Sequence, residues 1–175
     1  MPVVWIHGAF GVGKSSVAAE LQRVGGEFVV FDPELVGYLL RGIVPVPSGD
    51  FQDLPQWREL VVATAASLHR HGASTVVAPM TLLRRAYFDE IVGGLRGCGV
   101  AVVHVLLDAS DDELRRRITC DTSVPDTTTA WRLAKLDDYR SARPWLSEMA
   151  DLVIDTEAVP ISQAATMVLD TLHSP

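Results

Sequence analysis

The chain has 175 residues and a hydrophobic content of 48%, which suit one domain, residues 1–175, with a substantial core. Its formal net charge of −7 argues against a nucleic-acid partner, because no basic face is expected to form. We expect no membrane span and no signal peptide. Cys98 and Cys120 lack metal-ligand spacing, which favours reduced thiols in a reducing compartment. We expect a cytoplasmic protein that is a monomer or a homodimer.

The first predicted element is a buried strand over residues 3–6, and a helix from Lys14 to about Arg23, closed by Gly25-Gly26, comes after it. Between them, residues 8–15 read Gly-x-x-x-x-Gly-Lys-Ser, the P-loop pattern. The residues expected to contact a nucleotide in this stretch are Gly8, Ala9, Phe10, Gly11, Val12, Gly13, Lys14, Ser15 and Ser16.

The chemistry of phosphate binding explains why these residue types occur at this spacing. Glycines let consecutive backbone N–H groups turn inward, and the start of the helix adds partial positive charge. Lys14 can reach the β- and γ-phosphates, and the Ser15 hydroxyl can ligate Mg²⁺. The alternative is a glycine-rich turn that binds nothing. The strand before and the helix after favour ATP and Mg²⁺ as cofactors.

A second strand over residues 28–31 ends at Asp32, and Pro33-Glu34 opens the next helix. Asp32 is a candidate catalytic base that takes the proton of an acceptor hydroxyl, and a candidate magnesium ligand. It can equally serve as the N-cap of the helix, and one residue can do both. An irregular segment over residues 44–56 precedes a helix over 57–70. We expect the acceptor side to span about residues 33–72.

A third strand over residues 75–78 ends in Pro79-Met80-Thr81, where a motor ATPase would carry an acidic residue. This ending disfavours a motor and fits small kinases, which need only one carboxylate near Mg²⁺. A helix over 83–96 and a strand over 101–107 follow.

Ser110 is expected to cap a helix that ends in Arg115-Arg116-Arg117. The polar residues 119–129 then predict a mobile lid over about residues 117–132. A catalytic arginine commonly enters from such a segment, and Arg117 is the favoured candidate. The alternative is that the three arginines only complement the negative end of their helix.

The remaining elements are a helix over residues 129–141, a strand over 152–154 and a last helix from Ser162, as its cap, to Leu172. Apolar runs thus alternate with helical patterns throughout. This order predicts a three-layer α/β/α domain with a five-stranded, mainly parallel sheet. Ligands then lie at the carboxyl ends of the strands, where Thr156 is a further candidate nucleotide contact.

Several side chains are candidates for binding the acceptor. An arginine can hold a carboxylate or a phosphate, although a solvated helix face is the default for any single one. Aromatic side chains can stack on a flat substrate, although core packing explains them as well. His104 lies inside a strand and is expected to be a core histidine. The acceptor-side candidates, besides Asp32, are Arg41, Phe51, Trp57, Arg58 and Thr81.

The chain resembles the tunicamycin-resistance protein family, within the adenylate-kinase-like and shikimate-kinase-like P-loop kinases. The stretches that carry the resemblance are residues 5–14, 32–34, 50–52, 57–58 and 79–81, with Pro55, Tyr87-Phe88 and Glu90-Ile91. The resemblance implies an ATP-binding protein of nucleoside-monophosphate-kinase fold, connected with resistance to a nucleoside antibiotic. Kinases of this group often carry a second lid arginine four residues after the first. That position here is Asp121, and Arg132, Arg140 or Arg143 can substitute.

We therefore expect a small-molecule kinase that transfers phosphate from ATP to an alcohol group, with Lys14, Asp32 and Arg117 as its catalytic residues. The acceptor is a small molecule, of which a nucleoside antibiotic is one candidate. The alternative is a binding protein that uses ATP as a conformational ligand and sequesters a drug without phosphorylating it.

Overall fold

The computed structural model describes residues 1–25, 28–72 and 74–173, and its centre is a parallel sheet of five strands in the order β2-β3-β1-β4-β5. Each neighbouring pair of strands is parallel. The strands are β1 Val3–His7, β2 Phe28–Val30, β3 Thr75–Pro79, β4 Val102–Asp108 and β5 Leu152–Asp155. The predicted parallel sheet is confirmed.

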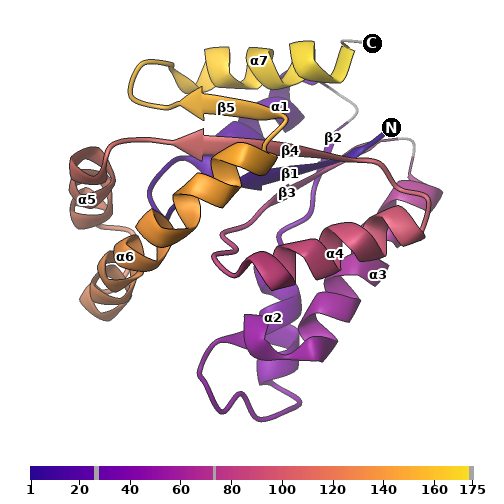
Figure 1. Cartoon of the computed structure of the whole chain (residues 1–175), viewed down its shortest axis with the longest axis horizontal. Coiled ribbons are helices and arrows are strands. Elements are labelled where there is room, and N and C mark those ends of the chain that lie inside the picture. The colour runs from indigo at the N-terminus through magenta and orange to yellow at the C-terminus, as the bar shows by residue number, and fades with distance from the viewer. Residues whose placement is uncertain (26–27, 73, 174–175) are drawn as a thin grey trace.

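Helices cover both faces of this sheet, with α1 and α7 on one side and α3 and α4 on the other (Figure 1). Both α5 and α6 lie on the side toward which the strand arrowheads of Figure 1 point, which is the carboxyl edge of the sheet. The helices are α1 Lys14–Gly25, α2 Glu34–Arg41, α3 Pro55–His71, α4 Arg85–Gly97, α5 Asp111–Cys120, α6 Asp126–Met149 and α7 Ile161–His173, with a 3-10 turn η1 at Phe51–Asp53. The three-layer prediction is confirmed. In the part of the chain that the structure describes, no helix has the length and apolarity needed to cross a bilayer.

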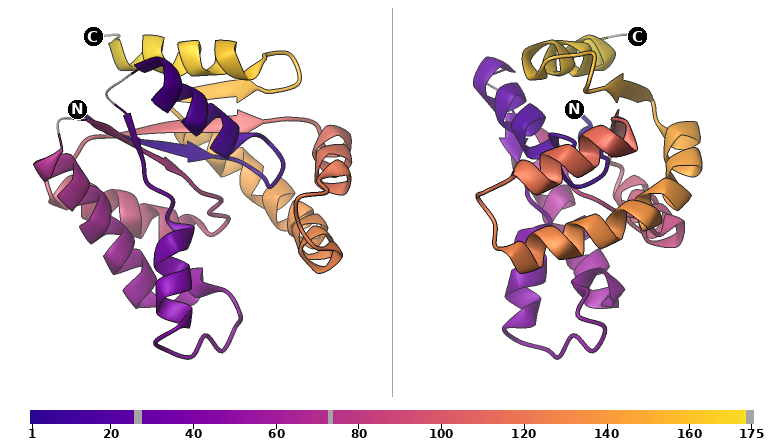
Figure 2. Two further views of the ribbon diagram at one scale, coloured as in Figure 1. Left: turned by 180° about the vertical axis from the view of Figure 1, so that it is seen from behind. Right: turned by 90° about the vertical axis from the view of Figure 1, so that its left-hand side faces the viewer.

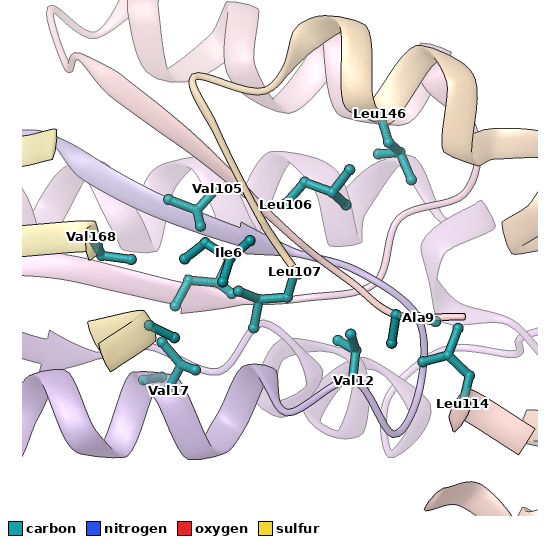
Figure 3. Packing of buried hydrophobic residues seen from close by; sticks show 14 of the residues in the cluster. Ile6, Ala9, Val12, Val17, Val105, Leu106, Leu107, Leu114, Leu146 and Val168 are labelled. Carbon is teal, nitrogen blue, oxygen red and sulfur yellow. The ribbon is translucent and has the colours of Figure 1, made fainter. Parts of the chain in front are cut away.

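Strand β1 is buried along its whole length because its side chains alternate between two cores. Val4 and Ile6 point into the core under α1, α5 and α7, where Ile6 packs with Val105 and Leu107 (Figure 3). Val3 and Trp5 point into the opposite core, which α2, α3 and α4 cover. Two full cores hold β1 in place, so the loop that follows starts from a fixed position.

Helix α6 differs most from the prediction, which ended a helix at residue 141 and left 119–129 irregular. In the structure α5 continues to Cys120 and α6 runs from Asp126 to Met149, so only residues 121–125 lie between the two helices. Low helix propensity at 127–129 and the missing N–H of Pro144 were outweighed by burial. The side chains of Leu136, Tyr139 and Leu146 all pack into the core.

Polar contacts anchor the middle of α6 to the carboxyl end of β4. The Tyr139 hydroxyl donates to Asp108 Oδ1 at 2.7 Å. Arg143 lies 3.2 Å from Asp108 and 3.1 Å from Asp111, and it donates to the Ala109 carbonyl at 2.8 Å. Burial, with the Asp108 carboxylate second, raises the pKa of Tyr139 well above its usual value. Figure 2 shows α6 crossing the carboxyl edge beside α5 as a continuous helix. The irregular stretch predicted over residues 119–129 is therefore wrong, since only a short turn lies between the two helices; the mobile lid stays a prediction.

Smaller differences concern element ends. The irregular segment expected over 44–56 contains η1, and α3 already begins at Pro55. Ser162 is the second residue of α7 and lies inside the helix rather than at its cap. Ser110 does cap α5, since its hydroxyl accepts the Glu113 N–H at 3.2 Å. Of the two glycines expected to close α1, Gly25 is its last residue and Gly26 lies outside the described residues.

Two glycines in helices provide a matched test of the packing around the acceptor side. A Cβ on Gly37 of α2 would lie 2.5 Å from the Phe51 ring, whereas one on Gly93 of α4 would meet no atom within 4 Å. We expect Gly37→Ala to lower the free energy of unfolding by about 1–3 kcal/mol through overpacking. Gly93→Ala should raise it by about 0.5–1 kcal/mol. Urea unfolding of both variants measures this, and equal effects would contradict the packing.

Candidate functional site

The P-loop leaves β1 at a point where only glycine fits. Gly8 has a φ of +143°, and a Cβ there would lie 2.4 Å from the Leu107 carbonyl oxygen. Gly11 and Gly13 also have positive φ values, and α1 starts directly afterwards at Lys14. The strand–loop–helix context predicted from the sequence is confirmed. The loop therefore presents its backbone at the positive end of α1, as anion binding requires.

Lys14 lies across this loop. Its Nζ donates to the carbonyl oxygens of Gly8 at 3.0 Å and Ala9 at 2.7 Å, and it lies 5.5 Å from the centre of the Phe10 ring. The pKa of Lys14 is lowered to about 7, mainly by burial; the Glu34 carboxylate opposes this shift and the nearby Arg132 adds to it. A phosphate group beside this ammonium would favour its charged form.

Three neighbouring cavities that share lining residues open at the carboxyl edge of the sheet. The P-loop cavity, of about 530 Å³, is lined by P-loop residues including Lys14 and Ser15. The α2 cavity, of about 640 Å³, lies against α2 and η1, and the α4 cavity, of about 310 Å³, lies against the start of α4. Phe10 lines all three. A ligand on the P-loop thus adjoins space for a second molecule.

Most predicted nucleotide and metal residues lie around the P-loop cavity. They are Phe10, Gly11, Gly13, Lys14, Ser15, Ser16, Asp32 and Arg117, and the acceptor-side candidate Thr81 lines the same cavity. Ala9 and Val12 are buried and contribute backbone to the loop. Asp32 Oδ1 accepts the Glu34 N–H at 2.9 Å, so Asp32 stabilises the start of α2 while also lining the cavity. Both alternatives raised by the sequence are compatible with this position.

Arg117 and Thr156 bind each other. Arg117 donates to the Thr156 hydroxyl at 2.9 Å, to the Thr156 carbonyl at 2.8 Å and to Glu113 at 2.6 Å. The Thr156 hydroxyl in turn donates to the Asp108 carbonyl at 3.1 Å. The guanidinium of Arg117 is therefore held by protein groups while its side chain lines the P-loop cavity. Direct contact of Arg117 and Thr156 with the nucleotide stays a prediction.

The acceptor-side candidates form two groups: side chains that line the α2 cavity, and buried side chains that pack behind that lining. Arg41 and Phe51 line the α2 cavity, with the Arg41 guanidinium 5.0 Å from the Phe51 ring centre. Trp57 is fully buried, and its indole N–H donates to the Pro33 carbonyl at 3.0 Å. Arg58 is also buried; it binds Glu90 and the Gln52 carbonyl, both at 2.6 Å. Trp57 and Arg58 therefore pack behind the residues that line the α2 cavity. This corrects their prediction as substrate contacts.

Glu34 was not predicted from the sequence to be a functional residue. Glu34 lines both the P-loop cavity and the α2 cavity, whereas Asp32 lines the P-loop cavity. Its Oε2 accepts the Tyr38 hydroxyl at 3.0 Å. The sequence signal that could have identified Glu34 was Asp32-Pro33-Glu34. Glu34 lies in the first turn of α2, at the same carboxyl edge of the sheet as Asp32. Glu34 therefore lies where the two cavities meet.

Part of one face of α6 was missed as a functional surface, although the aromatic side chain of Trp131 was a candidate for stacking on a flat substrate. Trp131 is 49% exposed, and its ring lies edge-on to Phe10 with the centres 5.0 Å apart. Lys135, Asp138 and Trp145 follow at helical spacing and line the α4 cavity. The helix predicted over residues 129–141 contains Trp131, Lys135 and Asp138, and only Trp145 lies beyond its predicted end. The P-loop and α6 thus form one aromatic wall.

Buried contacts join the P-loop to the segment after β3. The Thr81 hydroxyl donates to the Gly8 carbonyl at 2.8 Å, and the Leu82 N–H donates to His7 Nε2 at 2.9 Å. His7 Nδ1 lies 3.1 Å from Nε2 of His104, which is buried as predicted. Burial lowers the pKa of both imidazoles, so they are neutral near pH 7. These contacts fix the acceptor-side residue Thr81 against the P-loop.

A parallel sheet of this order, with a P-loop after its central strand, is the fold of the small-molecule P-loop kinases. The chain belongs to the family described as AAA domain, which matches residues 3–144, and its relatives are shikimate kinases. The shikimate kinase of Bordetella avium is 30% identical over 98% of this chain and 79% of its own length.

Solved structures extend this result. The tunicamycin resistance protein of Deinococcus radiodurans superposes with a TM-score of 0.74 at 28% identity, covering 99% of this chain and 96% of that one. The APS kinase of Mycobacterium tuberculosis, solved with AMPPNP and APS, gives a TM-score of 0.70 at 20% identity, covering 99% and 98%. The second likeness concerns the fold alone. The predicted resemblance to tunicamycin resistance proteins is confirmed.

The lowered pKa of Lys14 predicts a proton linkage in nucleotide binding. Bound phosphate raises this pKa above its value of about 7, so binding at pH 8 should take up about one proton and affinity should fall as the pH rises above 7. Isothermal calorimetry in two buffers of different ionisation enthalpy measures the uptake. Lys14→Arg, which stays charged, should abolish it, and an uptake near zero in the wild type would contradict the linkage.

The buried histidines predict a loss of stability in weak acid. Because the pKa values of His7 and His104 lie below the ordinary 6.5, the unfolded chain binds protons that the folded chain excludes. The free energy of unfolding should be highest above pH 6.5 and fall between pH 6.5 and 5. His7→Asn should make this slope shallower in denaturant titrations at each pH. An unchanged slope would contradict the assignment to these imidazoles.

Proposed function

We propose that the protein is an ATP- and Mg²⁺-dependent kinase that phosphorylates a hydroxyl group of a nucleoside antibiotic similar to tunicamycin. The observation that carries the proposal is the junction at Phe10, where the P-loop cavity meets two further cavities. A donor on the P-loop would direct its terminal phosphoryl group toward the α2 cavity. Family membership supports ATP as the donor, and the likeness to the Deinococcus radiodurans protein supports the acceptor class.

The size and lining of the acceptor space support an acceptor larger than a single small ring. The α2 cavity alone has a volume of about 640 Å³, which is typical of sites for drug-sized ligands. Aromatic rings of Tyr38 and Trp131 line it together with the charged groups of Arg41 and Lys135. Such a lining suits a flat ring that carries polar substituents.

The residues present also fit a magnesium ion. The Ser15 hydroxyl and the Asp32 carboxylate line the same cavity, and both supply oxygen donors, which Mg²⁺ prefers. When bound, the ion would offset the negative charge of the phosphates. Asp32, expected from the sequence to be the base, is better placed for this role because it lies on the donor side.

We assign the role of general base to Glu34. Its carboxylate would take the proton of the acceptor hydroxyl as that oxygen attacks the γ-phosphorus and the bond to the ADP oxygen breaks. Lys14 and Arg132 would stabilise the charge on the transferring group. The products are ADP and the phosphorylated acceptor.

Mass spectrometry after incubation with ATP, Mg²⁺ and tunicamycin tests the proposal. We expect a product that gains one phosphoryl group. Glu34→Gln should lower the rate about 10²-fold or more while nucleotide binding is retained. Glu59→Gln, on the exposed side of α3, is the matched control and should leave the rate unchanged.

Two results would contradict the proposal. Equal activity of Glu34→Gln and Glu59→Gln would remove Glu34 as the base. ATP-dependent binding of the antibiotic without any phosphorylated product would favour the alternative, a protein that sequesters the drug.

A further inference from the structure

The α5–α6 turn carries an ion pair on the wall of the P-loop cavity. Arg132 donates from Nη1 to Asp121 Oδ2 at 2.8 Å, and both side chains line that cavity together with Lys14 and Ser15. A carboxylate on the wall of a triphosphate site repels its ligand. The pair therefore bears on nucleotide binding.

Arg132 lies at the end of the P-loop cavity nearer the acceptor. It lines the α2 cavity as well as the P-loop cavity. Its guanidinium lies 5.8 Å from the centre of the Phe10 ring, and the Lys14 ammonium lies 5.5 Å from the same centre. Because a P-loop lysine reaches the β- and γ-phosphates, a cation beside it at this junction is placed for the γ-phosphoryl group.

Asp121 is held in position by its own turn. Its Oδ1 accepts the Ser123 N–H at 3.0 Å and the Ser123 hydroxyl at 2.5 Å, while Oδ2 binds Arg132. Arg132 thus faces a fixed anion of the protein, whereas the guanidinium of Arg117 is tied to Thr156 and Glu113.

We propose that Asp121 and the γ-phosphate compete for Arg132, which makes Asp121 a positioning residue that tunes the preference for ATP over ADP. A triphosphate reaches Arg132 and takes it from Asp121. A diphosphate lacks the group that reaches this junction, so Asp121 keeps Arg132 when ADP is bound. The ion pair therefore restrains ATP affinity, and it re-forms after phosphoryl transfer.

This inference rests on ATP use at the proposed site and does not require that transfer takes place. Equilibrium binding of a non-hydrolysable ATP analogue and of ADP, each with Mg²⁺, tests it separately from the kinase assay. Asp121→Asn is the appropriate variant because its amide oxygen can still accept the Ser123 N–H. Asp112→Asn removes the same charge from an exposed position of α5 and is the matched control.

We expect Asp121→Asn to bind the ATP analogue about threefold to tenfold more tightly, with ADP affinity changed by less than about twofold. Arg132→Met should weaken binding of the analogue and largely remove the effect of Asp121→Asn. Asp112→Asn should bind both nucleotides like the wild type. Thermal melting should show all variants folded.

Three results would overturn the inference alone. They are unchanged or weaker analogue binding by Asp121→Asn, an equal gain for ADP, and an equal gain in the Arg132→Met background, which would reveal simple repulsion. Absence of any nucleotide binding to the wild type would overturn this inference and the proposed function together. A missing phosphorylated product would affect the proposed kinase activity alone.

Discussion

The site depends on the close passage of the chain from β1 into the P-loop. Gly8 lies so near the Leu107 carbonyl that a Cβ would come within 2.4 Å of it, and Thr81 donates to the Gly8 carbonyl at 2.8 Å. The neighbouring strands β4 and β3 therefore hold the loop from both sides. Because β1 is buried between two cores, the loop and the segment after β3 keep one relative position.

The fold could be predicted because parallel strands buried on both faces appear as apolar runs between helical patterns. The extent of α6 could not, because Pro144 and the threonines at 127–129 oppose a helix locally. Only the tertiary contacts of Tyr139 with Asp108, and of Leu146 with the core, reveal why the helix continues. For the same reason, the irregular stretch predicted over residues 119–129 is only a short turn between α5 and α6 in the structure.

The donor half of the site could be predicted because local sequence encodes it, from the glycines to Lys14 and Ser15. Which side chains line the acceptor half of the site depends on how each helix is rotated about its axis. The spacing of residues in the sequence does not give that rotation. Glu34 faces the junction while Arg58 turns inward to Glu90. From the sequence, Asp121 was only the position at which related kinases often have a second lid arginine. Its ion pair with Arg132 depends on how α5 packs on α6, which the sequence does not give.

The central claim is that the γ-phosphoryl group of ATP faces the junction of the three cavities at Phe10. A crystal structure with Mg²⁺ and a non-hydrolysable ATP analogue tests it most directly. The account predicts the terminal phosphate between Lys14 and Arg132, beside Glu34 and open to the α2 cavity. A terminal phosphate that points away from the α2 cavity, with Arg132 and Glu34 out of contact, would contradict it.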